Sequence, residues 1–209
     1  MSLSGLYAVT SEAVCEDPQR LVSAVSAALA GGARLIQYRD KRASAEQREE
    51  RAKRLLRLCH DAGAALIIND DTELALRSGA DGVHLGASDG AIRNARLRLG
   101  PRAIIGRSCS GSLERAQAAA AEGASYVAFG RFFASKTKPD APPASLELLD
   151  AARAALALPI CVIGGLTADN AGPLRARGAD LIAAVDGVFG APDIEAAARG
   201  YLKLFKDPT

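Results

Sequence analysis

The chain has 209 residues, of which 26 are Lys or Arg and 24 are Asp or Glu, so its formal net charge is only +2. This length allows one large domain, and a hydrophobic fraction of 49% suffices for a buried core. A nucleic-acid-binding protein usually carries a clustered basic excess, and a membrane-spanning helix needs about 18 apolar residues. The sequence shows neither. Four widely spaced cysteines without a CxxC pair indicate no zinc site and no disulfide framework, so we expect a cytoplasmic enzyme or small-molecule binder.

Eight short apolar runs alternate with helical stretches along the chain. The first run, 6–10, is followed by a helix predicted over 18–30. The second run, 34–38, is followed by an amphipathic stretch over 44–61 that opens on a capping box at Ser44. The later runs cover 65–68, 82–85, 103–106, 126–129, 160–163 and 181–185.

A Gly-Ala pair recurs where each of five predicted helices gives way to a strand. The five glycines are Gly32, Gly63, Gly79, Gly123 and Gly178. Glycine ends a helix by adopting the left-handed conformation, and apolar strands joined by crossover helices predict a parallel sheet buried on both faces. A doubly wound sheet would need a glycine-rich loop after its first strand, where TSEA stands instead. We therefore predict one α/β domain over 1–209, a (β/α)8 TIM barrel with about 26 residues per unit.

Charged side chains follow several of the predicted strands at their carboxyl ends, where this fold places its active site. Arg39, Lys41 and Lys138 are cations suited to a polyanion, whereas Asp70 and Asp89 follow two neighbouring strands. Proteins usually hold Mg²⁺ by one or two carboxylates together with phosphate oxygens. The combination predicts a site for pyrophosphate carried on Mg²⁺, although a rim of solvated ion pairs remains the alternative for any single residue.

A second anion site is indicated by the pair Gly164-Gly165 after the seventh strand. Loops at this position of TIM barrels often bind phosphate through backbone N–H groups, although two glycines also suit a simple tight turn. Two separate anion sites imply two phosphorylated substrates, or one long one. We expect no nucleic-acid or membrane partner, and a homodimer is left open.

Seven segments, in this order and spacing, resemble the thiamine-phosphate synthase family over residues 5–189. They are GLYAVT (5–10), IQYRDK (36–41), LIINDD (66–71), GVHLG with the following Asp89 (82–89), IIGRS (104–108), YVAFGRFFASKTKPDAPPAS (126–145) and VIGGLTADNA (162–171). The resemblance implies a transferase of thiamine biosynthesis with a TIM-barrel fold. An aminopyrimidine methyl pyrophosphate would lose pyrophosphate, and the ring nitrogen of a thiazole phosphate would attack the exposed methylene to give thiamine phosphate.

The resemblance also implies roles for individual residues. Contacts to the pyrimidine pyrophosphate are implied for Gln37, Tyr38, Arg39, Asp40, Lys41, Asn69, Ser108 and Lys138, and among these Arg39, Lys41, Ser108 and Lys138 would serve catalysis. Asp70 and Asp89 match ligands of the Mg²⁺ cofactor. The thiazole phosphate would be held by Ser135, Lys136, Thr137, Gly165, Val185 and Asp186.

Some positions depart from the family pattern and keep two alternatives open. Asp186 stands where Ser or His is more usual, and its carboxylate would repel a phosphate unless only backbone N–H groups bind it. Ser110 stands where a related thiazole tautomerase would be expected to carry a His. The alternatives are therefore such an isomerase, or a non-catalytic paralogue that binds thiazole or thiamine phosphate. His84 is expected to be a satisfied core residue rather than a catalyst.

Overall fold

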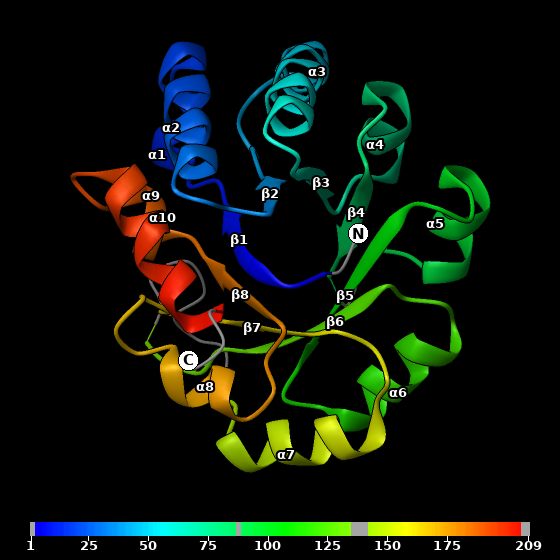
Figure 1. The fold of residues 1–209 in the computed structure, drawn as a ribbon. Helices are drawn as coiled ribbons and strands as arrows, with labels where there is room; N and C mark the ends of the chain where they lie inside the picture. The colour runs from blue at the N-terminus through cyan, green and yellow to red at the C-terminus, as the bar shows by residue number, and fades with distance from the viewer. Residues whose placement is uncertain (1–2, 87–88, 135–141, 206–209) are drawn as a thin grey trace.

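The computed structural model describes residues 3–86, 89–134 and 142–205. Within them, eight parallel strands close into a barrel in chain order, and the helices form a ring around it (Figure 1). The strands are β1 (Gly5–Val9), β2 (Leu35–Tyr38), β3 (Ala65–Asn69), β4 (Gly82–Leu85), β5 (Ile104–Ser110), β6 (Tyr126–Gly130), β7 (Ile160–Ile163) and β8 (Leu181–Ala184). The predicted (β/α)8 TIM barrel is confirmed.

The helices follow the strands in the predicted alternation. They are α1 (Glu12–Cys15), α2 (Pro18–Ala30), α3 (Ala45–Asp61), α4 (Thr72–Ser78), α5 (Ile92–Leu99), α6 (Leu113–Ala121), α7 (Leu146–Ala155), α8 (Gly172–Ala176), α9 (Asp186–Phe189) and α10 (Ile194–Leu202), followed by a 3-10 turn over Lys203–Phe205. The capping box at Ser44 is confirmed, because its hydroxyl accepts from the Gln47 N–H while the Gln47 side chain accepts from the Ser44 N–H. In the part of the chain that the structure describes, no helix is long and apolar enough to cross a membrane.

The predicted helix-ending glycines adopt the backbone conformation that the Gly-Ala pairs indicated. Positive φ angles are found at the five of them, which are Gly32, Gly63, Gly79, Gly123 and Gly178. A residue with a Cβ is strained in this region, so glycine allows the chain to leave the helix and enter the next strand within a few residues. The four cysteines are buried free thiols, in agreement with the expectation that no disulfide framework forms.

Two hydrophobic cores stabilise the barrel. The smaller one fills its interior with side chains that alternate along the strands, namely Tyr7, Val9, Leu35, Ile67, Tyr126, Ala128, Cys161, Leu181 and Ala183. The larger one lies between the strands and the surrounding helices. Because both faces of each strand are buried, the strands read as continuous apolar runs, which is why the sequence predicted a parallel sheet.

Strand β5 extends beyond the predicted run of 103–106. Its last residues are polar, and its register with β6 shifts between Ser108 and Ser110, which pair with Ala128 and Phe129. Of the residues in this extension only Cys109 is buried in the core, so a hydrophobic run could not reveal it. Arg107 and Ser108 are therefore strand residues, and the hydrogen bonds of the barrel fix their backbone positions.

Candidate active site

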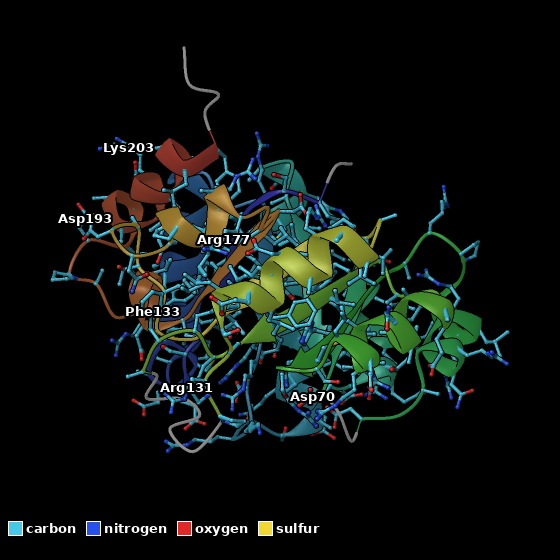
Figure 2. All side chains as sticks on the ribbon, turned by 90° about the horizontal axis from the view of Figure 1, so that it is seen from below. Asp70, Arg131, Phe133, Arg177, Asp193 and Lys203 are labelled. Atoms are coloured by element: carbon cyan, nitrogen blue, oxygen red, sulfur yellow. The ribbon has the colours of Figure 1, made fainter. Side chains whose placement is uncertain are left out.

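The carboxyl ends of the strands bring several of the predicted residues to one end of the molecule. Figure 2 shows Asp70, just beyond β3, and Arg131, just beyond β6, at the same end, while Lys203 lies at the opposite end. A cavity of about 330 Å³ opens beside Asp70. It is lined by Tyr38, Asp40, Lys41, Arg48, Ile68, Asn69, Asp70, Asp71 and Leu74.

The carboxyl groups of Asp70 and Asp89 meet at this end of the barrel. Asp70 has a left-handed φ of 63°, unusual for a non-glycine residue, and its N–H donates to the carbonyl of His84 at 2.8 Å. Burial raises the pKa of Asp70, and the hydrogen bond and charge of Asp89 raise it further. Asn69, whose Nδ2 donates to Asp70 Oδ2 at 2.6 Å, and Lys41 oppose this rise in pKa only in part.

Hydrogen bonds at Gly86 and Gly90 hold the described residues around Asp89 where its carboxyl can approach Asp70. The N–H of Gly86 donates to Asp89 Oδ2 at 2.8 Å, and a Cβ at Gly86 would stand only 2.5 Å from that oxygen. Arg107 holds the backbone on either side of Asp89, because its guanidinium donates to the carbonyls of Gly86 at 2.6 Å and Gly90 at 2.9 Å. The motif IIGRS contained Arg107, but nothing in the sequence showed that it would hold the neighbouring loop.

The meeting of these two carboxyls fits the chemistry of a magnesium site. Two adjacent carboxyl groups repel each other when both are ionised, so one of them tends to keep its proton. A divalent cation in place of that proton would relieve the repulsion. Among the described residues no group of three or more His, Cys, Asp or Glu side chains gathers as a metal site. Asp70 and Asp89 therefore offer the one or two protein carboxylates that Mg²⁺ typically takes, with the other ligands left to phosphate and water.

Arg39 and Lys41 lie on the loop that follows β2. The Arg39 side chain is only 16% exposed and lies 3.6 Å from Glu12 of α1. Its backbone is held by Thr10, whose hydroxyl accepts from the Arg39 N–H at 2.9 Å. Lys41 lines the cavity beside Asp70. The structure thus brings two of the three predicted cations to the end of the barrel that carries the two carboxyls.

Asp40 is directed into the protein. Its carboxylate accepts hydrogen bonds from the backbone N–H groups of Arg42 and Ala43, from the Tyr38 hydroxyl and from Arg51 Nη1 at 2.7 Å. Its side chain is 2% exposed. The resemblance implies that Tyr38 and Asp40 contact substrate, and both residues line the cavity beside Asp70. Their polar groups also bond each other, and the hydrogen bonds of Asp40 hold the loop that carries Arg39 and Lys41.

Substituting Asp40→Asn is expected to lower the free energy of unfolding by about 2–3 kcal/mol, because Arg51 would lose its buried partner. Burial alone would raise the pKa of Asp40, but the hydrogen bonds from Arg42, Ala43, Tyr38 and Arg51 outweigh it and hold the pKa below its ordinary value of 3.8. The ionised Asp40 carboxylate therefore contributes its full stabilisation at pH values above 3.8, and this stabilisation is lost as the pH falls through the lowered pKa of the folded protein. Urea titrations between about pH 6 and pH 3 should show a weaker pH dependence in the variant.

An exposed ion pair provides the control for this substitution. Asp150 pairs with Arg177 on the surface, and Asp150→Asn should change the free energy of unfolding by less than about 0.5 kcal/mol. Equal destabilisation by the two variants, or an unchanged acid titration in Asp40→Asn, would contradict the internal role of Asp40.

Gln37 and Ser108 project from β2 and β5, and each contacts a buried aromatic side chain. Gln37 Nε2 donates to the Tyr7 hydroxyl at 2.6 Å, and Ser108 Oγ lies 2.8 Å from His84 Nε2. His84 is 8% exposed with both ring nitrogens bonded, so its prediction as a satisfied core residue is confirmed. The sequence did not single out Tyr7 and Tyr126, which link these side chains inside the barrel, because an aromatic residue within an apolar strand gives no sign of such a contact.

The loop after β7 is closely packed against the residues that follow β6. Gly165 has a left-handed φ of 62°, and a Cβ there would overlap the carbonyl oxygen of Ala134 and stand 3.0 Å from Phe133 Cβ. Asn170 Nδ2 donates to the Gly165 carbonyl at 2.9 Å, which fixes the loop from the other side. Glycine is therefore required here by both conformation and space, and the backbone of the loop is held in one position.

The start of α9 packs on the same β7 loop. Val185 is the N-cap of α9 and Asp186 is its first residue, while a Cβ at Gly187 would overlap the carbonyl of Leu166. Gly165, Val185 and Asp186 are therefore on neighbouring loops, as the predicted thiazole-phosphate site requires. The other predicted residues of this site, Ser135, Lys136 and Thr137, lie outside the described residues, as does Lys138.

Comparison with known proteins shows the family of this chain. The sequence model of the family described as thiamine monophosphate synthase matches residues 6–188. Thiamine phosphate pyrophosphorylase from Pyrococcus furiosus is 34% identical with a TM-score of 0.87, over 97% of this chain and 95% of that chain.

Two more distant structures share the fold alone. They are thiamine phosphate pyrophosphorylase from Bacteroides thetaiotaomicron (16% identity, TM-score 0.70, 96% of this chain and 97% of that chain) and GGGPS from Thermoplasma volcanium (13%, 0.71, 98% and 94%). The family match spans most of the chain, and the Pyrococcus structure extends the likeness to the whole barrel. The chain belongs to the thiamine monophosphate synthase family.

Proposed function

We propose that this chain is a thiamine-phosphate synthase, which joins an aminopyrimidine methyl pyrophosphate to a thiazole phosphate and releases pyrophosphate. The observation that supports it best is the meeting of Asp70 and Asp89 beside Lys41 at the mouth of the barrel. Paired carboxylates next to a cation suit a metal-bound pyrophosphate, and the likeness to the Pyrococcus furiosus pyrophosphorylase has the same implication.

The cations of the mouth bind the pyrophosphate and stabilise the charge that grows on it as it leaves. Arg39 offers a guanidinium fork and Lys41 a compact charge, and both lie on the loop that follows β2. Lys138 is assigned to the same group from the sequence. Asp70 and Asp89 would hold Mg²⁺, which when bound supplies Lewis-acid stabilisation of the leaving pyrophosphate.

The chemistry requires no nucleophile from the protein. The bond between the pyrimidine methylene and the pyrophosphate oxygen breaks, and the lone pair of the thiazole nitrogen forms the new carbon–nitrogen bond. Gln37, Asn69 and Ser108 orient the pyrimidine, so that the methylene faces the thiazole. Positioning and electrostatic stabilisation then account for catalysis. Asp40 and Tyr38 contribute indirectly by holding the loop of Arg39 and Lys41.

The thiazole phosphate is assigned to the loops after β6, β7 and β8. Ser135, Lys136 and Thr137 are retained in this role from the sequence, together with Gly165. Backbone N–H groups at Gly165 and at the start of α9 would bind the anion, and this arrangement lets Val185 and Asp186 take part without the Asp186 carboxylate facing the phosphate. We place the activity in the cytoplasm, since four buried free thiols suit a reducing compartment.

A single assay tests this function against the alternatives. The purified chain, mixed with both substrates and Mg²⁺, is expected to release thiamine phosphate and pyrophosphate in equal amounts, measured by fluorescence after oxidation to a thiochrome and by a pyrophosphate-coupled assay. Isomerisation of the thiazole without condensation would instead support the tautomerase alternative, in which Ser110 replaces the expected His. Binding of thiazole phosphate without any product would support the non-catalytic paralogue.

A further inference from the structure

Five polar side chains form a continuous hydrogen-bonded chain across the interior of the barrel. Gln37 Nε2 lies 2.6 Å from the Tyr7 hydroxyl, which lies 2.8 Å from the Tyr126 hydroxyl. Tyr126 is in turn 2.8 Å from His84 Nδ1, and His84 Nε2 is 2.8 Å from Ser108 Oγ. The three central residues come from β1, β6 and β4, and the two ends are residues that the proposed function assigns to the pyrimidine.

Because Gln37 Nε2 faces Tyr7 in the structure, the hydrogen-bonding capacity of the other groups determines the direction of the hydrogen-bonded chain. An amide nitrogen can only donate, so the Tyr7 oxygen accepts from Gln37. If Tyr126 also donated to Tyr7, the Tyr7 proton would be buried without an acceptor among the described residues. Buried donors without an acceptor are destabilising and rare in folded proteins. Tyr7 therefore donates to Tyr126, which donates to His84 Nδ1.

The direction continues through the imidazole to Ser108. A neutral His84 that accepts at Nδ1 carries its proton at Nε2 and donates it to Ser108 Oγ. Burial raises the pKa of both Tyr7 and Tyr126 well above the ordinary value of 10.0, so both phenols stay protonated. The proton of Ser108 is then free to point toward the substrate, and the side-chain oxygen of Gln37 is free to accept.

The position of Tyr126 is itself built into the barrel. Gly106 on β5 lies beside it, and a Cβ at Gly106 would overlap both the ring and the hydroxyl of Tyr126. The ring of Tyr126 also meets the Tyr7 ring edge-on, with centroids 5.8 Å apart. The phenol therefore occupies a space that a glycine on the neighbouring strand provides, and its hydroxyl has little freedom to leave the chain.

We propose that the chain Gln37–Tyr7–Tyr126–His84–Ser108 is a positioning unit that selects an aminopyrimidine over its oxo analogue. This inference rests on the proposed function. The Gln37 oxygen accepts from an exocyclic amino group, and the Ser108 hydroxyl donates to a ring nitrogen. An oxo group would place its oxygen against that of Gln37 in the orientation that the structure shows. Reversing the Gln37 amide would require the hydrogen bonds of Tyr7, Tyr126, His84 and Ser108 to reverse together. Tyr7, Tyr126 and His84 are thus positioning residues that do not touch the reacting atoms.

Tyr126→Phe tests the unit, because it removes the hydroxyl that joins the two halves. We expect the KM for the pyrimidine pyrophosphate to rise about tenfold, and the preference for it over the competitive oxo analogue to fall about tenfold. The KM for thiazole phosphate should stay within about twofold of the wild-type value, since the β7 loop is untouched. Tyr201→Phe is the matched control: it also removes a buried hydroxyl, which bonds the Leu166 carbonyl at 2.9 Å, and it should leave the amino-over-oxo preference unchanged.

Nitrogen NMR of His84 in the unliganded wild-type protein provides a readout that does not depend on activity. The unit requires the tautomer protonated at Nε2, and detection of the Nδ1-protonated tautomer would overturn it even if Tyr126→Phe fails to fold. An active wild-type enzyme whose Tyr126→Phe variant keeps the same KM and preference would also overturn it. A wild-type protein that makes no thiamine phosphate would instead refute the proposed function. The His84 tautomer would still show whether the five side chains are hydrogen-bonded in the proposed direction.

Discussion

Asp70→Asn is expected to reduce turnover by roughly a thousandfold while the barrel stays folded. Asparagine keeps the size of the side chain and tolerates the left-handed φ of 63°, so the backbone should not change. It removes one of the two negative charges that would hold Mg²⁺ against the pyrophosphate. Because burial and Asp89 both raise the pKa of Asp70, its ionised form is unfavourable in the free protein, and the variant should melt no lower than the wild type.

The measurements are turnover with saturating substrates over a Mg²⁺ titration, and thermal unfolding. Asp89→Asn should show a loss of the same order, and the double variant should lose much less than the product of the two, because both residues serve one ion. Asp193→Asn is the control, since Asp193 is an exposed cap of α10 and asparagine caps equally well. Turnover of Asp70→Asn within about tenfold of the wild type would refute the assignment of Asp70 to the metal.

Gly165→Ala is the second large expected effect, with the Kd for thiazole phosphate raised roughly 10–100-fold. The added methyl overlaps the carbonyl of Ala134 and approaches Phe133, so the loop must shift by an amount that costs about 1–3 kcal/mol. A shifted loop no longer presents its backbone N–H groups in the geometry of the anion. Isothermal titration with thiazole phosphate measures the loss, and the KM for the pyrimidine pyrophosphate should change little.

Gly63→Ala is the control variant for Gly165→Ala. It introduces the same backbone strain without displacing the β7 loop. Gly63 has nearly the same φ, 65° against 62° at Gly165, but a Cβ there meets nothing within 4 Å. It also precedes β3, at the end of the barrel opposite to the site. We expect Gly63→Ala to lower stability by about 1 kcal/mol and to leave thiazole-phosphate affinity unchanged. Equal loss of affinity in both variants would argue against a phosphate site at the β7 loop.

The predictable part of the site consists of residues whose position follows from the barrel itself. Lys41, Asp70 and Gly165 each follow an apolar run within a few residues, and the parallel sheet brings those run ends to one mouth. The closure of the barrel thus places them together without any knowledge of their side-chain contacts. For Ser135, Lys136, Thr137 and Lys138, which follow β6 and lie outside the described residues, the assignment to substrate rests on the sequence alone.

Side-chain direction was not predictable in the same way. Asp40 stands between two cations in the motif IQYRDK, so the pattern grouped it with them, yet its carboxylate turns inward to Arg51 of α3. The pairing depends on where a separate helix packs against the β2 loop. Arg107 similarly acts on a loop that precedes it by about 20 residues in the chain, a contact made by strand pairing alone.

By itself, the amino-acid sequence determined the barrel and the end of it that carries the polar residues. Short continuous apolar runs between helical stretches favour strands buried on both faces, and glycine after a helix marks where five of the eight strands begin. Only the tertiary structure decided that Tyr7, Tyr126 and His84 link Gln37 to Ser108. Those residues come from different strands, and each is indistinguishable from core in its own segment. Their hydrogen bonds exist because barrel closure brings four buried polar side chains and the partly buried Ser108 within reach of one another, and each buried polar group must find a partner.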